Sequence, residues 1–350
     1  MMAQFTWASV LTGLLDHQDM DTAEVSWAMD QILSNNASPV QVAGFLVALR
    51  AKGETVGEIR GMADVMLDKA VSLTMPNDAV DVVGSGGDRA NTVNISTMAA
   101  IVAAASGRPV IKHGNRAASS MSGTADCLEA LGLVIDVDPT KQPEVFEQAG
   151  ISFLFAPLYH ASLRFAAPAR KELGIQTTFN FLGPLANPAR PQAQAIGVAN
   201  LRMAGLVAGV LADRGNRGLV FHGKDGLDEL TTTGETDIWL IRDGAVHETT
   251  LDPAALGLAP AKPSDLVGGD PAHNAQVARD VFAGQTGPVR DIVGLNAAAA
   301  MLAFDGPSFD EPLVEQMRPR LAEAFATLDE GRATQLLERW VAISHEVAGV

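Results

Sequence analysis

Cysteine is almost absent from this chain of 350 residues, which contains only Cys127. A single cysteine forms neither an internal disulfide nor a cysteine metal cage, so the sequence excludes disulfide-stapled folds and fits a reducing cytoplasm. Cys127 lies in the segment Ala125–Leu131, which has a helical pattern. We interpret it as a small core residue and not as a nucleophile.

Long apolar runs are lacking as well, and none reaches the roughly 20 residues that a membrane span needs. The N-terminus shows no basic stretch followed by a cleavage site, so we expect no secretory leader and no membrane partner. Hydrophobic residues still make up 47% of the chain, which is typical of a globular protein. The length predicts one large domain and a smaller one.

Positive charge is scarce, because 25 lysines and arginines face 41 acidic residues and the formal net charge is −16. This balance opposes non-specific nucleic-acid binding, which needs a basic surface. A small anionic ligand remains possible, since the potential of one pocket can differ in sign from that of the surface. We expect Arg89, Lys112 and Arg116, which lie near glycine-rich loops, to serve one site.

The chain begins with helical patterns up to about residue 70. Asp21 precedes one helix, Ser38 caps a second that ends at Gly53, and Thr55 with Glu58 forms a capping-box pattern for a third. Helical periodicity without strands over this length predicts a small all-α unit.

From residue 80 onward, short apolar segments alternate with helical ones. This alternation predicts an α/β fold with a mainly parallel sheet flanked by helices. Asp243-Gly244 separates two further segments, 238–241 and 245–249, and predicts a hairpin at one edge of the sheet. The other expected strands are Val80–Val83, Pro109–Lys112, Leu133–Val137, Ile151–Phe155, Ala193–Val198 and Leu219–His222. Helices are expected over 97–106, 125–131, 201–213, 289–303 and 313–328.

A glycine loop follows the first expected strand. Gly84, Gly86 and Gly87 allow positive φ and close approach of the backbone to a ligand, and Asp88 adds an acceptor. The loop ends in neither the lysine of a P-loop nor the spacing of the dinucleotide fingerprint. Alone, it is equally compatible with a tight turn.

Hydroxyl and amide side chains gather at the start of the next helix, at Thr92, Asn94, Ser96 and Thr97. Ordinary N-capping explains one of them but not the whole set. A helix N-terminus that follows a glycine loop is a good anion-binding position.

Two cations follow the second strand, in Lys112-His-Gly-Asn-Arg116, and Ser119, Ser120, Ser122 and Gly123 come next. Open α/β sheets bind ligands at the carboxyl ends of their strands, so we expect a site here. A solvated surface loop is the alternative.

Farther along, Asp225-Gly-Leu-Asp-Glu229 follows the strand 219–222. Its carboxylates suit Mg²⁺ that is shared with phosphates, or they form a solvated charge pair.

Taken together, these motifs resemble those of the anthranilate phosphoribosyltransferase family, which has the nucleoside phosphorylase/phosphoribosyltransferase fold. The similarity runs along nearly the whole chain and is specific only as a set. The segments that carry it are 41–55, the glycine loop, Asn94–Thr97, Lys112–Ser120, Arg170–Gly174, Phe179–Pro188 and Asp225–Glu229.

The resemblance implies transfer of a phosphoribosyl group from 5-phosphoribosyl-1-pyrophosphate (PRPP) to anthranilate, with Mg²⁺ as cofactor. It implies that Mg²⁺ is bound by Ser96, Asp228 and Glu229. Anthranilate would contact Gly84, Asn115 and Arg170, the last through its carboxylate, as suits a guanidinium. The implied PRPP-binding residues are Gly84, Gly87, Asp88, Thr92, Asn94, Ile95, Ser96, Thr97, Lys112, His113, Gly114, Asn115, Arg116, Ala117, Ala118, Ser119, Ser120 and Thr124.

The chain departs from the family pattern at three places. Ser85 stands for a threonine and keeps its hydroxyl, whereas Arg89 stands for a glycine, which restricts the loop and adds a cation. The sequence leaves open whether Arg89 tunes substrate affinity or points to solvent. The segment Ala161–Arg164 also differs from the usual small residues beside His160.

The expected chemistry is direct attack of the anthranilate amine on the sugar C1 as pyrophosphate leaves, with no protein nucleophile. Mg²⁺, Lys112 and backbone amides would stabilise the leaving group. Because an arylamine is weakly basic, no strong general base is required. His113 or His160 could accept the proton, or each could be a structural hydrogen-bonding residue.

Two rival functions remain on the sequence alone. A pyrimidine nucleoside phosphorylase of the same fold would have a different lysine loop, and a non-catalytic nucleic-acid-binding relative would show a basic surface.

We expect a helical domain from residues 1–74 and about 163–188, and an α/β domain from about 75–162 and 189–350, with the site between them. The resemblance also implies a homodimer formed through the helical domain.

Overall fold

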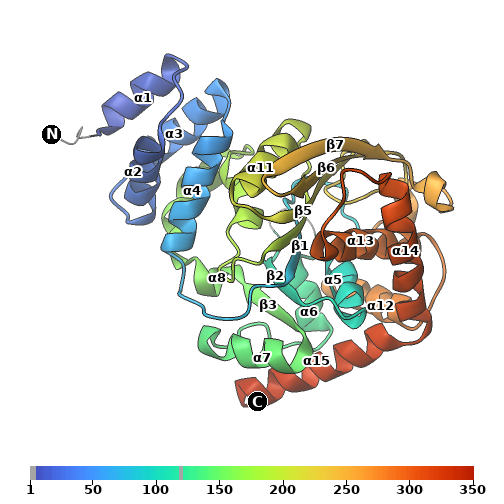
Figure 1. Cartoon of the computed structure of the whole chain (residues 1–350). Helices are drawn as coiled ribbons and strands as arrows, with labels where there is room; N and C mark the ends of the chain where they lie inside the picture. The colour runs from blue at the N-terminus through green and yellow to red at the C-terminus, as the bar shows by residue number, and fades with distance from the viewer. Residues whose placement is uncertain (1–4, 118–120) are drawn as a thin grey trace.

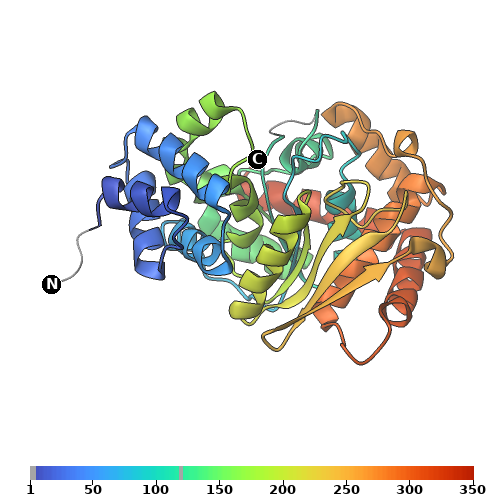
Figure 2. The same cartoon turned by 90° about the horizontal axis from the view of Figure 1, so that it is seen from above.

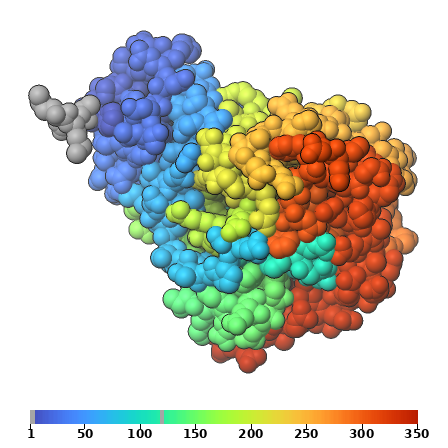
Figure 3. Space-filling model, viewed as in Figure 1, coloured from blue at the N-terminus to red at the C-terminus, as the bar shows by residue number. Residues whose placement is uncertain are grey.

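The computed structural model describes residues 5–117 and 121–350 of the chain. A lobe of N-terminal helices stands against a larger body built around one sheet (Figures 1 and 3). Ala118, Ser119 and Ser120, which were predicted to bind PRPP, lie outside the described residues.

Four helices form the start of the chain: α1 (Trp7–Leu15), α2 (Thr22–Leu33), α3 (Pro39–Lys52) and α4 (Val56–Asp68). The capping predictions are confirmed. Asp21 accepts from the N–H of Glu24, Ser38 caps α3, and Thr55 and Glu58 form a capping box at α4. Gly53 ends α3 with a φ of 93°, in the region that favours glycine.

The sheet has seven strands in the order β3-β2-β1-β4-β5-β6-β7. The first five are parallel and the last two are antiparallel, with the predicted hairpin turn at Asp243-Gly244. The strands are β1 (Val80–Gly84), β2 (Val110–Gly114), β3 (Ile151–Phe155), β4 (Ala193–Gly197), β5 (Arg217–Gly223), β6 (Thr236–Arg242) and β7 (Ala245–Leu251). The mainly parallel α/β fold is therefore confirmed.

Helices cover both faces of this sheet (Figure 2). On one face, α5 (Ile95–Ala105) and α13 (Pro288–Asp305) pack on β1 and β4, and their apolar residues form the larger core. On the other face, α11 (Leu201–Asp213) packs on β5 and β6 and against α4. The remaining α-helices are α6 (Thr124–Ala130), α7 (Gln142–Ala149), α8 (Ala156–Tyr159), α9 (Ala167–Leu173), α10 (Phe179–Leu182), α12 (Pro271–Phe282), α14 (Leu313–Asp329) and α15 (Arg332–Ala348).

One predicted strand, Leu133–Val137, is wrong. The segment is extended and alternates buried with more exposed residues, which explains the prediction, but it joins no sheet. The N–H of Val134 instead donates to the Ser344 hydroxyl on α15, at 3.1 Å. The alternating pattern therefore reports burial against a helix and not strand pairing.

The short helices of residues 161–185 pack with the N-terminal lobe. Phe181 and Leu182 share a core with the apolar residues of α2, α3 and α4. The same core continues onto one face of the sheet through Ile196, Val220 and Trp239. The division into two domains stays a prediction, because the lobe and the sheet share this core.

Candidate active site

The carboxyl ends of β1 and β4 lie side by side, and the order of the sheet reverses between these two strands. Such a reversal is where open α/β sheets bind their ligands. The last residues of the two strands, Gly84 and Gly197, are paired in register. A Cβ at Gly84 would lie 2.3 Å from Asp228 Oδ2, and one at Gly197 would lie 1.6 Å from the Asp228 carbonyl oxygen. The two glycines therefore make the space that Asp228 occupies.

The loop that carries Asp228 and Glu229 is held from both sides. Asp225 accepts hydrogen bonds from the hydroxyls of Thr231 and Thr233. On the other side, Asn296 of α13 accepts from the N–H of Leu230 at 2.9 Å and donates to its carbonyl at 2.8 Å. The two carboxylates thus lie on a fixed loop and are not a solvated pair.

Three carboxylates, those of Asp88, Asp228 and Glu229, lie close enough to affect one another's charge. Asp228 accepts the N–H of Gly86 at 2.6 Å, and Glu229 accepts the N–H of Ser96, at the start of α5, at 3.2 Å. Burial, and then the charge of Asp88, raises the pKa of Asp228 to about 7. Burial, and then the charge of Asp228, raises the pKa of Glu229.

These crowded oxygen donors fit a hard divalent cation, because a positive charge would relieve the repulsion between them. Within the described part of the chain, no group of three or more acidic, histidine or cysteine side chains is arranged to hold a metal ion by itself. Mg²⁺ generally keeps several waters and shares the phosphates of a substrate.

The first turn of α5 offers the expected anion-binding position, although Asn94 does not cap the helix with its side chain. Asn94 donates instead to the carbonyl of Ser122 at 3.2 Å and accepts from Asn274 of α12 at 2.8 Å. The Thr97 and Thr124 hydroxyls are 3.4 Å apart. The start of α5 is thereby tied to the loop that follows β2, as the sequence predicts for one shared site.

Lys112 lies on β2 with an exposed fraction of only 1%. Its ammonium donates to the carbonyl of Val82 and lies 3.4 Å from the Ser96 hydroxyl. Burial lowers the pKa of Lys112, and the charges of Asp81, Glu229 and Asp228 oppose this effect. A buried cation therefore lies beside the carboxylates and the helix N-terminus.

Both candidate histidines are buried and bound to backbone carbonyls. The Nδ1–H of His113 donates to Gly183 at 3.2 Å, and Nε2 of His160 donates to Ala186 at 2.8 Å. Burial, and then the charge of His160, lowers the pKa of His113 to about 3. Burial also lowers the pKa of His160. This arrangement favours the structural interpretation of both side chains.

Two of the cations expected at the site differ in their surroundings. Arg116 pairs with Asp126 at 2.7 Å and with Glu129 at 2.8 Å, so its guanidinium faces α6. Arg89 is exposed, adopts a φ of 61°, and forms no ion pair within the described ranges. The left-handed backbone at Arg89 explains why glycine suits this position.

Arg170, on α9, is a half-buried cation without an acidic partner among the residues that the structure describes. Its guanidinium lies 5.5 Å from the centre of the Phe179 ring, and burial lowers its pKa. Nearby, Gln176 donates to the carbonyl of Gly87 at 3.3 Å, which links this segment to the glycine loop. A desolvated guanidinium without a counter-ion is suited to bind a carboxylate.

Two buried polar residues beside the site, Asp81 and Asn187, were not among the predicted site residues. Asp81 is fully buried, and its two carboxylate oxygens accept from the N–H of His113 at 3.2 Å and from Asn187 at 2.9 Å. The signal was present, since Asp81 is a charged residue inside an otherwise apolar strand.

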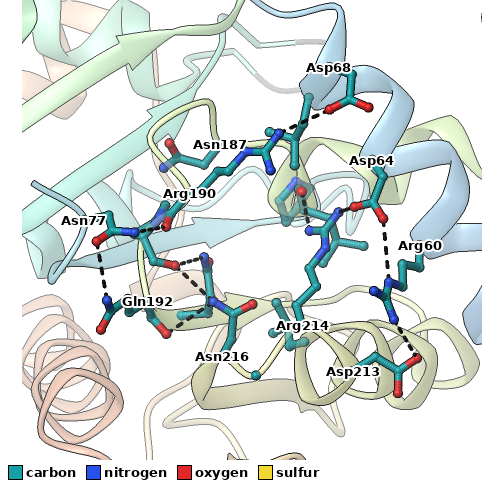
Figure 4. A pocket seen from close by; sticks show the side chains of 17 residues that line it. Arg60, Asp64, Asp68, Asn77, Asn187, Arg190, Gln192, Asp213, Arg214 and Asn216 are labelled. Carbon is teal, nitrogen blue, oxygen red and sulfur yellow. Dashed lines mark hydrogen bonds and ion pairs between the residues drawn. The ribbon is translucent and has the colours of Figure 1, made fainter. Parts of the chain in front are cut away.

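A cavity, called the rear cavity below, lies near the amino ends of β4 and β5, away from the candidate site. It measures about 540 Å³ and is lined by α4, Asn77, the segment 184–194 and residues 211–216 (Figure 4). Three arginines in this lining, Arg60, Arg190 and Arg214, are paired to aspartates. It appears as a hollow between the blue α4 and the yellow-green α11 (Figure 3). Asn187 lines this cavity, while its amide reaches Asp81 behind the site.

Comparisons with known proteins cover both parts of the chain. A family model described as "Glycosyl transferase family, a/b domain" matches residues 76–334. Another, described as "Glycosyl transferase family, helical bundle domain", matches residues 8–70.

Named relatives are similar over almost their whole length. The anthranilate phosphoribosyltransferase of Acidothermus cellulolyticus is 56% identical over 99% of this chain and 97% of the relative. The enzyme of the same name from Thermobifida fusca is 52% identical, and the match covers 97% of both chains.

Solved structures with the same name also superpose on nearly the whole chain. The anthranilate phosphoribosyltransferase of Thermus thermophilus superposes with a TM-score of 0.88 at 40% identity, over 96% of this chain and 99% of that one. The Saccharomyces cerevisiae enzyme in complex with PRPP and Mg gives a TM-score of 0.87 at 27% identity, over 99% of both chains. The yeast enzyme with 4-fluoroanthranilate gives 0.85 at 25% identity, over 97% and 99%.

Proposed function

This chain belongs to the anthranilate phosphoribosyltransferase family, and we infer that it transfers the phosphoribosyl group of PRPP to the amine of anthranilate. The products are N-(5-phosphoribosyl)anthranilate and pyrophosphate, in tryptophan biosynthesis. The observation that carries this conclusion is the switch-point site, where Lys112, the start of α5 and the Asp228-Glu229 loop converge.

The phosphoribosyl donor fits that site by charge and by hydrogen-bonding capacity. We place its phosphates against the glycine loop 84–88, the first turn of α5 and Lys112, where backbone N–H groups and an ammonium are close together. The yeast relative solved with PRPP and Mg supports PRPP as the donor. Arg116 would have to exchange at least part of its pairing with Asp126 and Glu129 to reach a phosphate.

Mg²⁺ belongs to the same proposal. Ser96, Asp228 and Glu229 would hold it, with Asp88 close enough to add charge, since the oxygen donors and their raised pKa values fit a divalent cation. When bound, the ion supplies charge stabilisation for the departing pyrophosphate.

Anthranilate fits the segment that carries Arg170. The half-buried guanidinium would bind the substrate carboxylate, and Gly84 and Asn115 would border the ring. A yeast relative solved with 4-fluoroanthranilate supports this substrate class. Two substrates held in line turn a bimolecular encounter into a near-unimolecular step.

The residues of the chain then bind, orient and neutralise charge without forming a covalent intermediate. Lys112 and the amides at the start of α5 stabilise the negative charge that grows on pyrophosphate as the C1–O bond breaks. With a pKa of about 3, His113 stays neutral near pH 7 and is a poor proton acceptor. We therefore propose that His113 and His160 position the segment 183–186 through its carbonyls.

A homodimer is part of the proposal as well. Val40 and Val47, seven residues apart on one face of α3, are exposed to 81% and 42%, and Leu15 at the end of α1 is exposed to 72%. Such apolar exposure suits an interface formed through the helical lobe.

The described residues contain no helix long and apolar enough to cross a membrane. The cytoplasmic location stays a prediction from the single cysteine.

The direct test follows anthranilate fluorescence as the purified chain is mixed with PRPP and MgCl₂. We expect anthranilate to disappear with release of an equal amount of pyrophosphate, and both signals to stop when EDTA removes the metal. Phosphorolysis of pyrimidine nucleosides without anthranilate turnover would instead favour the nucleoside phosphorylase alternative.

A further inference from the structure

Strands β1 and β2 form a regular ladder only at their beginning. Val80 pairs with Val110, and this is the only register pair between the two strands in the described chain, whereas β1 and β4 pair over five positions. A parallel ladder would next join the N–H of Val82 to the carbonyl of Ile111, and the N–H of His113 to the carbonyl of Val82. The carbonyls of Ile111 and Val82 and the N–H of His113 have other partners here.

Side chains replace the missing rungs. Asp81 accepts from the N–H of His113 at 3.2 Å, the Lys112 ammonium donates to the carbonyl of Val82, and Asn187 donates to the carbonyl of Ile111 at 2.8 Å. Asn187 also donates to Asp81 at 2.9 Å and accepts from the N–H of Ala189 at 3.0 Å. We name Asp81, Lys112 and Asn187 the polar wedge, because they fill the gap between two parallel strands.

The polar wedge is completely internal. Asp81, Lys112 and Asn187 are exposed to 0%, 1% and 3%. Burial raises the pKa of Asp81 to about 6, although the charge of Lys112 opposes this shift. Because this pKa lies above its ordinary value, stability that is present at low pH is lost as the pH rises through 6. Replacing buried charged groups with apolar side chains of similar volume is often neutral or stabilising, so burial of the wedge is weak evidence for a purely stabilising role.

What the wedge sets is the spacing at the carboxyl ends of the two strands. β1 leads directly into the glycine loop, and β2 carries Lys112 and leads into Asn115 and Arg116, so the regular pairing between the two sides of the phosphate site stops where the wedge begins. We propose that Asp81 and Asn187 are positioning residues that hold β1 and β2 apart and so place Lys112 and the glycine loop for the phosphoribosyl donor. The proposal rests on the PRPP site inferred above.

The wedge also ties the site to the segment 183–190. Gly183 accepts from His113, Ala186 accepts from His160, and Asn187 reaches Asp81 from the wall of the rear cavity (Figure 4). This segment joins the short helices of the helical lobe to β4. Through Asn187, the position of this connecting segment therefore affects the position of β1 and β2 beneath the PRPP site.

The test compares Asp81→Asn and Asn187→Ala with Glu58→Gln. Glu58 is an equally buried carboxylate that accepts backbone N–H groups and pairs with a lysine, but it lies in the helical lobe. We expect each wedge variant to raise KM for PRPP at least tenfold and KM for anthranilate less than threefold. Glu58→Gln should leave both values within twofold, whatever it does to the melting temperature.

Amide hydrogen exchange gives a second measurement that does not need turnover. The amides of residues 82–84 and 112–114 should exchange faster in both wedge variants and be unchanged in Glu58→Gln. Unchanged KM for PRPP with unchanged exchange would overturn the proposal, as would an equal rise in both KM values. If wild-type protein shows no turnover, the proposed function fails, and the exchange comparison still decides whether the wedge sets the strand spacing.

Discussion

At the scale of single residues, the structure brings most of the predicted site together. The sequence placed Ser96, Lys112, Asp228 and Glu229 on separate motifs, and the fold puts them around one point. Partners that depend on neighbours far away in the chain could not be read from a pattern. No local motif indicates that Arg116 faces Asp126 and Glu129, or that Asn94 binds Asn274 instead of capping its helix.

Arg170 provides the sharpest prediction at this scale. Replacing it with glutamine should raise KM for anthranilate roughly 10- to 100-fold, because a charge-assisted hydrogen bond to a carboxylate contributes about 1.5–3 kcal/mol. KM for PRPP should change little. Steady-state kinetics with each substrate varied in turn measures both constants. Arg164→Gln is the matched control, since Arg164 is an exposed arginine nearby that stacks on Phe165.

At the scale of helices and strands, the structure agrees with the residue pattern except where a side chain forms a hydrogen bond with the backbone of another element. The alternation in Leu133–Val137 was real, but it reflects packing next to α15 and not strand pairing. The strand Val80–Gly84 was predicted correctly, yet nothing local indicates that its ladder to β2 stops after one pair. Asp81 inside an apolar strand was the available sign.

Gly197 tests whether the end of the sheet holds Asp228 in place. Gly197→Ala puts a Cβ 1.6 Å from the Asp228 carbonyl oxygen, so the loop must shift. We expect a loss of stability of about 1–3 kcal/mol, as for other overpacked sites, and at least tenfold weaker PRPP binding in the presence of Mg²⁺. Thermal unfolding and calorimetry measure the two effects.

The control for that substitution is Gly234→Ala, because an added Cβ there meets no atom within 4 Å. It should match the wild type in both measurements. If Gly197→Ala bound PRPP as tightly as the wild type, the position of Asp228 would not depend on the space left by Gly197.

At the scale of the whole molecule, composition and order of motifs were informative about fold class and charge. They said little about cavities, and the rear hollow between α4 and α11 has no motif of its own. Its lining comes from four separate places in the chain, residues 60–68, Asn77, 184–194 and 211–216. The N-terminal helices were readable from their capping residues, but the shared core that joins them to the sheet was not.

We predict that two copies of the chain associate through exposed valines of the helical lobe. Light scattering after gel filtration should give twice the mass of one chain, and Val40→Asp with Val47→Asp should shift it toward one chain by placing charge in the interface. Val246→Asp, at an exposed valine on β7, should leave the mass unchanged. A wild-type protein that elutes as a single chain would contradict this assembly.

At this scale we propose that the switch-point site binds PRPP together with a divalent cation. Isothermal calorimetry of PRPP titrated into the wild-type protein tests it directly, with and without MgCl₂. We expect a saturable heat near one PRPP per chain when magnesium is present, and a much weaker one after EDTA. A folded protein that gives no heat with PRPP and magnesium together would contradict it.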